Sequence, residues 1–167
     1  TGKDEELGFT LESAPNLVNE SYFSENYDLS TFIGQKPIAI FLEKKDCAIC
    51  QQMHREAFAS KENYKALSDW HVIQIDVDEV DQEIILPNGT SQNIGDFIEG
   101  RIVDFLPTVI LYGFGETEET FRMDSYLTNY GVSSTLQYIG SGDYKSQPDL
   151  QRWSDETRAA RRAARGD

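Results

Sequence analysis

The chain has 167 residues, which suits one domain with a hydrophobic core that needs no disulfide staples. Hydrophobic residues make up 39% and aromatic residues 11% of the sequence, and this composition excludes a disordered chain. The 29 acidic residues outnumber the 15 basic ones and give a net charge of −14. That charge argues against nucleic acid and anionic membranes as partners, because both require a cationic surface.

The first half of the chain predicts a loose start followed by a buried strand and a helix. Residues 1–26 are polar and acidic and indicate an entry segment with short ordered pieces, and residues 28–33 predict a short helix. The apolar run 38–42 is typical of a strand buried on both faces. A charged loop is expected over 43–46, and a helical pattern begins at Cys47.

Strands and helices continue to alternate after residue 60. In chain order we expect a helix over 61–67, a strand over 71–77, a hairpin around 83–93, a helix over 94–105, strands over 108–112 and 120–123, a helix over 133–139 and a last helix after Pro148. This order predicts an α/β fold with a central mixed sheet and helices on both faces. Five arginines follow residue 150, and we expect that amphipathic helix to lie on the acidic body, the alternative being a docking tail for an acidic partner.

Two cysteines, Cys47 and Cys50, are separated by Ala48 and Ile49 and stand where a predicted strand gives way to a helix. A helix N-terminus has free N–H groups and a positive dipole end, which favour a thiolate over a thiol. The spacing is therefore typical of a redox pair in which the first cysteine is exposed and attacks and the second resolves the mixed disulfide. Two alternatives stay open. A zinc site would need two further ligands and the chain has only two histidines, His54 and His71, while an inert pair would need none.

Pro107 stands directly before the predicted strand 108–112. A cis proline there would bring its loop against the sulfur atoms, although the spacing alone does not establish a cis bond.

These features together resemble the thioredoxin-like superfamily, and within it the exported bacterial thioredoxin-related thiol:disulfide proteins of sulfur-oxidation (Sox) clusters. The resemblance spans about residues 28–145. It rests on Lys36-Pro37, the Cys47–Cys50 pair, Met53-His54-Arg55-Glu56-Ala57-Phe58, Ile75-Asp76-Val77, Leu106-Pro107-Thr108, Tyr126-Leu127, Tyr138-Ile139 and Gly142-Asp143-Tyr144-Lys145.

The resemblance implies a thioredoxin fold with a hairpin insertion before the helix that precedes a cis proline. It divides the chain into an N-terminal extension (1–27), a thioredoxin-like domain (28–146) and a C-terminal helical tail (147–167). It implies that Cys47 is the nucleophile, Cys50 the resolving thiol and Pro107 the cis proline. The substrate-facing residues would be Ala48, Ile49, Leu106 and Thr108.

The implied activity is thiol:disulfide exchange, most simply the reduction of protein disulfides, because no histidine lies between the cysteines. No cofactor or metal is expected. The partners would be a disulfide-containing protein and a soluble or membrane-bound thiol donor. The chain starts at Thr1 without an initiator Met or an apolar signal segment, which fits either a trimmed cytosolic protein or an exported protein whose signal has been removed. The resemblance implies the second, a periplasmic or otherwise exported protein.

Two positions beside the cysteine pair depart from thioredoxin itself. Asp46 replaces a tryptophan, and its negative charge opposes the thiolate. Phe41 stands where thioredoxin has a buried acid, so Glu43 is the nearest candidate to accept the proton of the resolving thiol, the alternative being an exposed loop carboxylate. Two rival functions share the fold: a non-catalytic binding or chaperone module, and an oxidase or isomerase.

Overall fold

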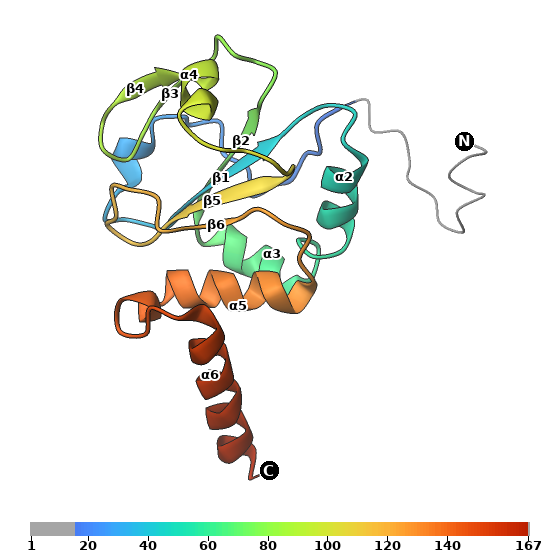
Figure 1. Cartoon of the computed structure of the whole chain (residues 1–167), viewed down its shortest axis with the longest axis vertical. Helices are drawn as coiled ribbons and strands as arrows, with labels where there is room; N and C mark the ends of the chain where they lie inside the picture. Colours follow the sequence, from blue (N-terminus) through green and yellow to red (C-terminus); the bar gives the residue numbers. More distant parts are fainter. Residues whose placement is uncertain (1–15, 167) are drawn as a thin grey trace, which may run out of the picture.

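A four-stranded mixed sheet forms the centre of the computed structural model, which describes residues 16–166 (Figure 1). The strands are β1 (Ile38–Glu43), β2 (His71–Asp76), β5 (Thr108–Tyr112) and β6 (Phe121–Met123), in the order β2-β1-β5-β6. Strand β1 pairs parallel with β2 and antiparallel with β5, and β6 pairs antiparallel with β5. The predicted central mixed sheet is thus confirmed.

Strand β1 is central because both of its faces are apolar. All six of its residues are buried. Side chains alternate along a strand, so Ala39 and Phe41 enter one hydrophobic core while Ile38, Ile40 and Leu42 enter the other. The run of apolar residues therefore separates two packed layers, as a strand covered on both faces requires.

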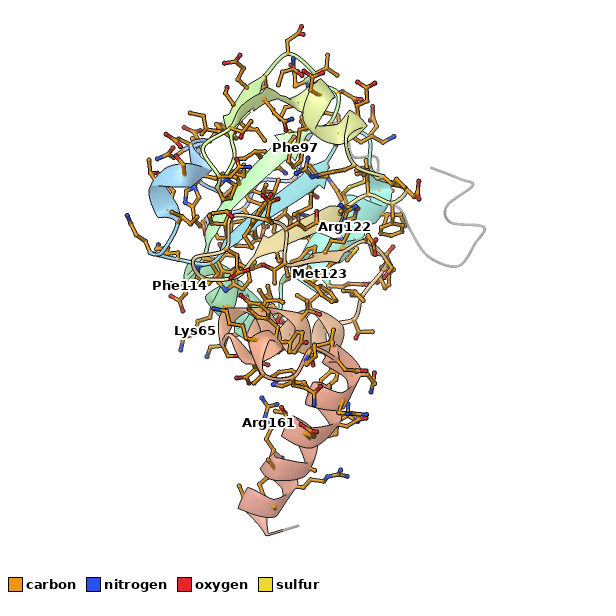
Figure 2. The ribbon with its side chains drawn as sticks, turned by 60° about the vertical axis from the view of Figure 1, so that its left-hand side comes forward. Lys65, Phe97, Phe114, Arg122, Met123 and Arg161 are labelled. Carbon is orange, nitrogen blue, oxygen red and sulfur yellow. A yellow bond between two sulfur atoms is a disulfide. The ribbon has the colours of Figure 1, made fainter. Side chains whose placement is uncertain are left out.

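Three helices cover the face on which Phe41 lies. They are α2 (Ala48–Arg55), α3 (Lys61–Ser68) and α5 (Asn129–Gly140). Helix α2 contributes the fully buried Met53, α3 contributes Leu67 and α5 contributes Val132 to this core. Met123 of β6 also belongs to it (Figure 2).

The opposite face is covered by a short 3-10 helix, η1 (Leu29–Phe32), by α4 (Ile94–Glu99) and by a two-stranded hairpin. The hairpin pairs β3 (Glu83–Ile85) with β4 (Ser91–Asn93) and lies before α4, as the hairpin insertion predicts. The second core includes the buried side chains of Leu29, Ile84 and Phe97. Phe97 of α4 is labelled in Figure 2. Helices thus lie on both faces of the sheet.

Two predicted helices have different bounds in the structure. The helix expected over 94–105 ends at Glu99, where the N–H of the C-cap Gly100 donates to the Asp96 and Ile98 carbonyls and the guanidinium of Arg101 folds back to donate to the Phe97 carbonyl. The helix expected over 133–139 begins earlier, at Asn129, because the Thr128 hydroxyl accepts from Gly131 N and caps it. The first change leaves residues 101–107 as a loop beside the cysteines.

The described part of the entry segment, residues 16–27, packs on the outer edge of β2. Phe23 forms a parallel bridge with Val72, and Ser24 N donates to the Val72 carbonyl at 2.7 Å. Tyr22 is buried in the core against the Phe41 ring. This segment therefore supplies side chains to the layer that contains α2.

The C-terminal helix α6 (Leu150–Arg165) projects away from the body, as Figure 1 shows. Its first turns are anchored by the buried Trp153, whose indole Nε1 donates to Asp143 of the 3-10 helix η2 (Asp143–Lys145) at 2.8 Å. The residues from Arg158 to the end of the helix are exposed. Arg158 and Arg161 donate to the uncharged side chains of Tyr130 and Gln137 on α5, and the last turns of the helix extend beyond the body. The expectation that the arginine-rich end lies on the acidic body is therefore met only in part.

Tyr130 offers a test of how α6 is docked on α5. Its hydroxyl lies 3.2 Å from Ser154 Oγ and accepts from Arg158 at 2.9 Å, and these bonds lower its pKa to about 8. We expect an ultraviolet titration to show one tyrosine ionising near that pH, since burial raises the pKa of Tyr112 and Tyr138. Arg158→Ala should move this transition upward, toward the ordinary value. An unmoved transition would contradict the docking geometry.

Candidate active site

Cys47 and Cys50 are joined in a disulfide at the start of α2. Cys47 is the N-cap of the helix, and its sulfur accepts from Cys50 N at 3.1 Å. Cys47 is 8% exposed and Cys50 is 1% exposed. Cys47 is therefore the more accessible of the two cysteines, but it is buried, so the expectation of an exposed first cysteine is wrong.

The loop between β1 and Cys47 carries three charged residues. Lys44, Lys45 and Asp46 are exposed. The Lys45 ammonium lies 4.0 Å from Asp76 at the end of β2, so its charge is directed toward the sheet end. Asp46, directly before Cys47, has a positive φ of 55°, a left-handed conformation that aspartate and asparagine tolerate better than most residues.

This loop geometry gives a clean test of the charge beside Cys47. Asp46→Asn removes the charge and keeps a residue that tolerates the left-handed backbone. We expect reduced Cys47 to be alkylated about twofold to fivefold faster at neutral pH, because an exposed charge at close range contributes on the order of 1 kcal/mol. Stopped-flow alkylation with mass analysis measures the rate, and a rate equal to wild type would show that Asp46 does not act on the thiolate.

A hollow of about 450 Å³ opens beside Cys47. Its apolar lining combines Ala48 and Ile49 of α2 with residues of the loop that precedes β5, Val103, Phe105 and Leu106. Lys44 and Asp104 add one charge of each sign. Three of the four predicted substrate-facing residues, Ala48, Ile49 and Leu106, therefore lie together next to Cys47.

The Leu106–Pro107 peptide bond is cis. Pro107 and Thr108 are both buried, and the Thr108 hydroxyl donates to the Phe105 carbonyl. The side chain of Thr108 thus supports the loop from within and does not line the hollow, which differs from its predicted role. The reason is that β5 begins at Thr108, in the middle of the sheet.

Glu43 is the last residue of β1 and is 1% exposed, so the expected loop begins one residue later and the alternative of an exposed carboxylate is wrong. His54 of α2, 4% exposed, donates through Nε2 to both carboxylate oxygens, at 3.0 and 2.9 Å. Gln74 of β2 donates to Glu43 Oε1 at 3.0 Å. A carboxylate with three donor contacts is compatible with burial, because a buried charge requires partners.

His54 is a functional candidate for which the sequence predicted no role beyond a possible zinc ligand. The available signal was its position four residues after Cys50, which places both side chains on one face of α2. The phenol oxygen of Tyr22 lies 3.5 Å from His54 Nδ1. The His54 ring also contacts those of Phe23, Phe41 and Phe58.

The described residues do not supply the ligands that a zinc site at the cysteines would need. Within residues 16–166, no three or more His, Cys, Asp or Glu side chains are grouped so as to hold a metal ion. His71 lies on the opposite face of the sheet, stacked on Phe32 at 3.6 Å, while His54 faces Glu43. Residues 16–166 also contain no helix with the length and apolar character needed to cross a membrane.

A scan against models of protein families found no match, and no curated protein matches the sequence. Solved structures do match. A thioredoxin-fold protein from Helicobacter pylori is 15% identical with a TM-score of 0.64, covering 83% of this chain and 88% of that one. A thioredoxin from Thermus thermophilus is 18% identical with a TM-score of 0.48, covering 62% and 73%. DsbH oxidoreductase is 14% identical with a TM-score of 0.46, covering 77% and 93%. Together with the sheet order and the disulfide at the start of α2, the Helicobacter match shows that this chain has the thioredoxin fold.

Proposed function

We propose that this protein is a thiol:disulfide oxidoreductase that reduces disulfides in other proteins. The observation that carries the proposal is the Cys47–Cys50 disulfide at a helix N-terminus, with its more accessible sulfur beside an open, mainly apolar hollow. A helix N-terminus stabilises a thiolate, and the hollow offers a place for an extended polypeptide next to that sulfur.

In the proposed reaction the Cys47 thiolate attacks one sulfur of a substrate disulfide. An S–S bond forms between Cys47 and the substrate, and the other substrate sulfur leaves as a thiolate. Cys50 then loses its proton to the Glu43 carboxylate and attacks Cys47, which releases the second substrate sulfur as a thiolate. Two electrons pass from the dithiol to the substrate, and the protein is left with the Cys47–Cys50 disulfide.

A thiol-donating partner, soluble or membrane-bound, is then needed to reduce the pair again. The resemblance to exported thioredoxin-related proteins of the Sox type supports a periplasmic or otherwise exported location. The missing histidine between the cysteines supports the reductive direction. Residues Ala48, Ile49 and Leu106 would contact the substrate chain through the hollow that they line.

The equilibrium reduction potential of the pair tests this proposal. The protein is titrated in defined thiol–disulfide buffers and its redox state is read by alkylation and mass spectrometry. We expect a value near that of thioredoxin, about −270 mV, whereas a value near −120 mV would identify an oxidant and reverse the direction. A pair that does not titrate would overturn the proposal and favour the binding or chaperone module.

A further inference from the structure

We propose that His54 and Glu43 form a proton relay for the resolving cysteine, with Glu43 receiving the Cys50 proton and His54 releasing one to solvent through Nδ1. The inference deepens the proposed function and rests on it. It assigns His54 the role of a positioning and proton-releasing residue, since the reacting sulfur atoms are those of the two cysteines.

The first step of the argument is the position of the pair relative to Cys50. Cys50 and His54 both lie on the buried face of α2, one turn apart. Side chains on a helix lean toward its N-terminus, and the turn on the N-terminal side of His54 is the one that carries Cys50. Glu43, which His54 contacts, ends β1 four residues before Cys47. The pair thus lies between the sheet and the first turns of the redox helix.

The second step concerns charge. In the proposed resting state Glu43 is a carboxylate and His54 an imidazolium, so the two hydrogen bonds between them join a buried pair with no net charge. When Glu43 takes the Cys50 proton, the carboxylate becomes neutral and an imidazolium would be left buried without a counter-charge. Such an uncompensated charge is costly, so His54 loses its Nδ1 proton. One proton therefore enters the pair at Glu43 and one leaves at His54, and Nε2–H continues to donate to Glu43.

The third step concerns the route by which the proton leaves His54 for solvent. His54 lines a second hollow of about 310 Å³, which is formed by Leu17, Val18, Asn19, Glu20, Gln51 and Arg55 and lies apart from the substrate hollow. The phenol of Tyr22 lies beside Nδ1. Burial raises the pKa of Glu20, so this carboxylate holds a proton more readily than an exposed glutamate. The proton thus leaves on the side of the entry segment, away from the substrate.

Other titratable groups surround the pair on every packed element. On the sheet, Asp76 is the register partner of Glu43 and is contacted by Lys45. From the entry segment come Glu20 and Tyr22, from α3 comes Tyr64, which packs on Tyr22, and Arg55 is the neighbour on α2. A pH profile must therefore be compared between variants and not interpreted from one protein alone.

The decisive experiment measures resolution of a preformed mixed disulfide between Cys47 and a chromogenic thiol. His54→Gln keeps an N–H that can donate to Glu43 but has no proton to release. We expect resolution to be slower by about tenfold or more at about pH 6, with the deficit closing toward about pH 9, where hydroxide removes the Cys50 proton directly. Formation of the mixed disulfide should be unchanged, because it involves only Cys47.

His71→Gln is the matched control, since His71 is buried on the opposite face of the sheet and has no part in the relay. It should resolve at the wild-type rate at every pH. Added imidazole provides a second test: it should accelerate His54→Ala, which leaves space beside Glu43, and should leave His54→Gln unaffected. Rescue of this kind identifies proton transfer and would not follow from lost packing.

Different failures have different meanings. If His54→Gln resolves like wild type, or is slowed equally at all pH values, the relay is wrong while the oxidoreductase stands. If the wild-type protein forms no mixed disulfide at all, both the relay and the proposed function are wrong.

Discussion

Cys50→Ser will accumulate a stable mixed disulfide between Cys47 and a protein substrate. The variant keeps the attacking thiolate at the N-cap of α2 and removes the group that displaces the substrate. Attack within one helical turn has a high effective concentration, so we expect release of the substrate to slow by about a hundredfold or more. Non-reducing gels and mass spectrometry of the adduct measure the effect.

Cys47→Ser is the control for this result, because the remaining Cys50 is only 1% exposed. It should form little or no adduct with the same substrate. If both single variants form adducts equally fast, the assignment of Cys47 as nucleophile is wrong. If neither forms one, the protein does not carry out thiol exchange.

Glu43→Gln will slow resolution by Cys50 and leave attack by Cys47 unchanged. The amide has nearly the shape of the carboxylate and still accepts from His54 or Gln74, yet it cannot take up a proton. We expect a loss of about tenfold or more at neutral pH, which rapid-quench alkylation of the mixed-disulfide state would measure. An unchanged rate would show that the Cys50 proton leaves by another route.

Glu43→Ala tests how much the same residue contributes to stability, as distinct from proton transfer. It removes the acceptor of both His54 and Gln74 from a site that is almost fully buried. Breaking a buried ion pair by deleting one partner costs about 3–5 kcal/mol, and we expect a loss of this size in the free energy of unfolding measured in urea. A loss confined to a few tenths would show that water or another group replaces the carboxylate.

Much of the fold could be predicted from the sequence because it follows local rules. The run 38–42 is apolar at every position, which specifies a strand buried on both faces, and the structure places it at the centre of the sheet. The failures lie where local and tertiary effects compete. Residues 101–105 continue a helical pattern of apolar spacing, yet Gly100 and the folded-back Arg101 end α4 before them.

The candidate site also combines features that follow from the local sequence with features that depend on tertiary packing. The cysteine pair and its place at a helix N-terminus are features of spacing along the chain, so Cys47 and Cys50 could be predicted from the sequence. The cis bond before Pro107 was implied only by the resemblance, because spacing does not specify a cis peptide, and the structure shows it. The burial of Glu43 depends on which helix and strand pack over the end of β1, and no local pattern specifies that. Glu43, His54 and Gln74 come from three elements, and only the tertiary structure decided that they meet, because a charge can be buried there only where distant donors converge on it.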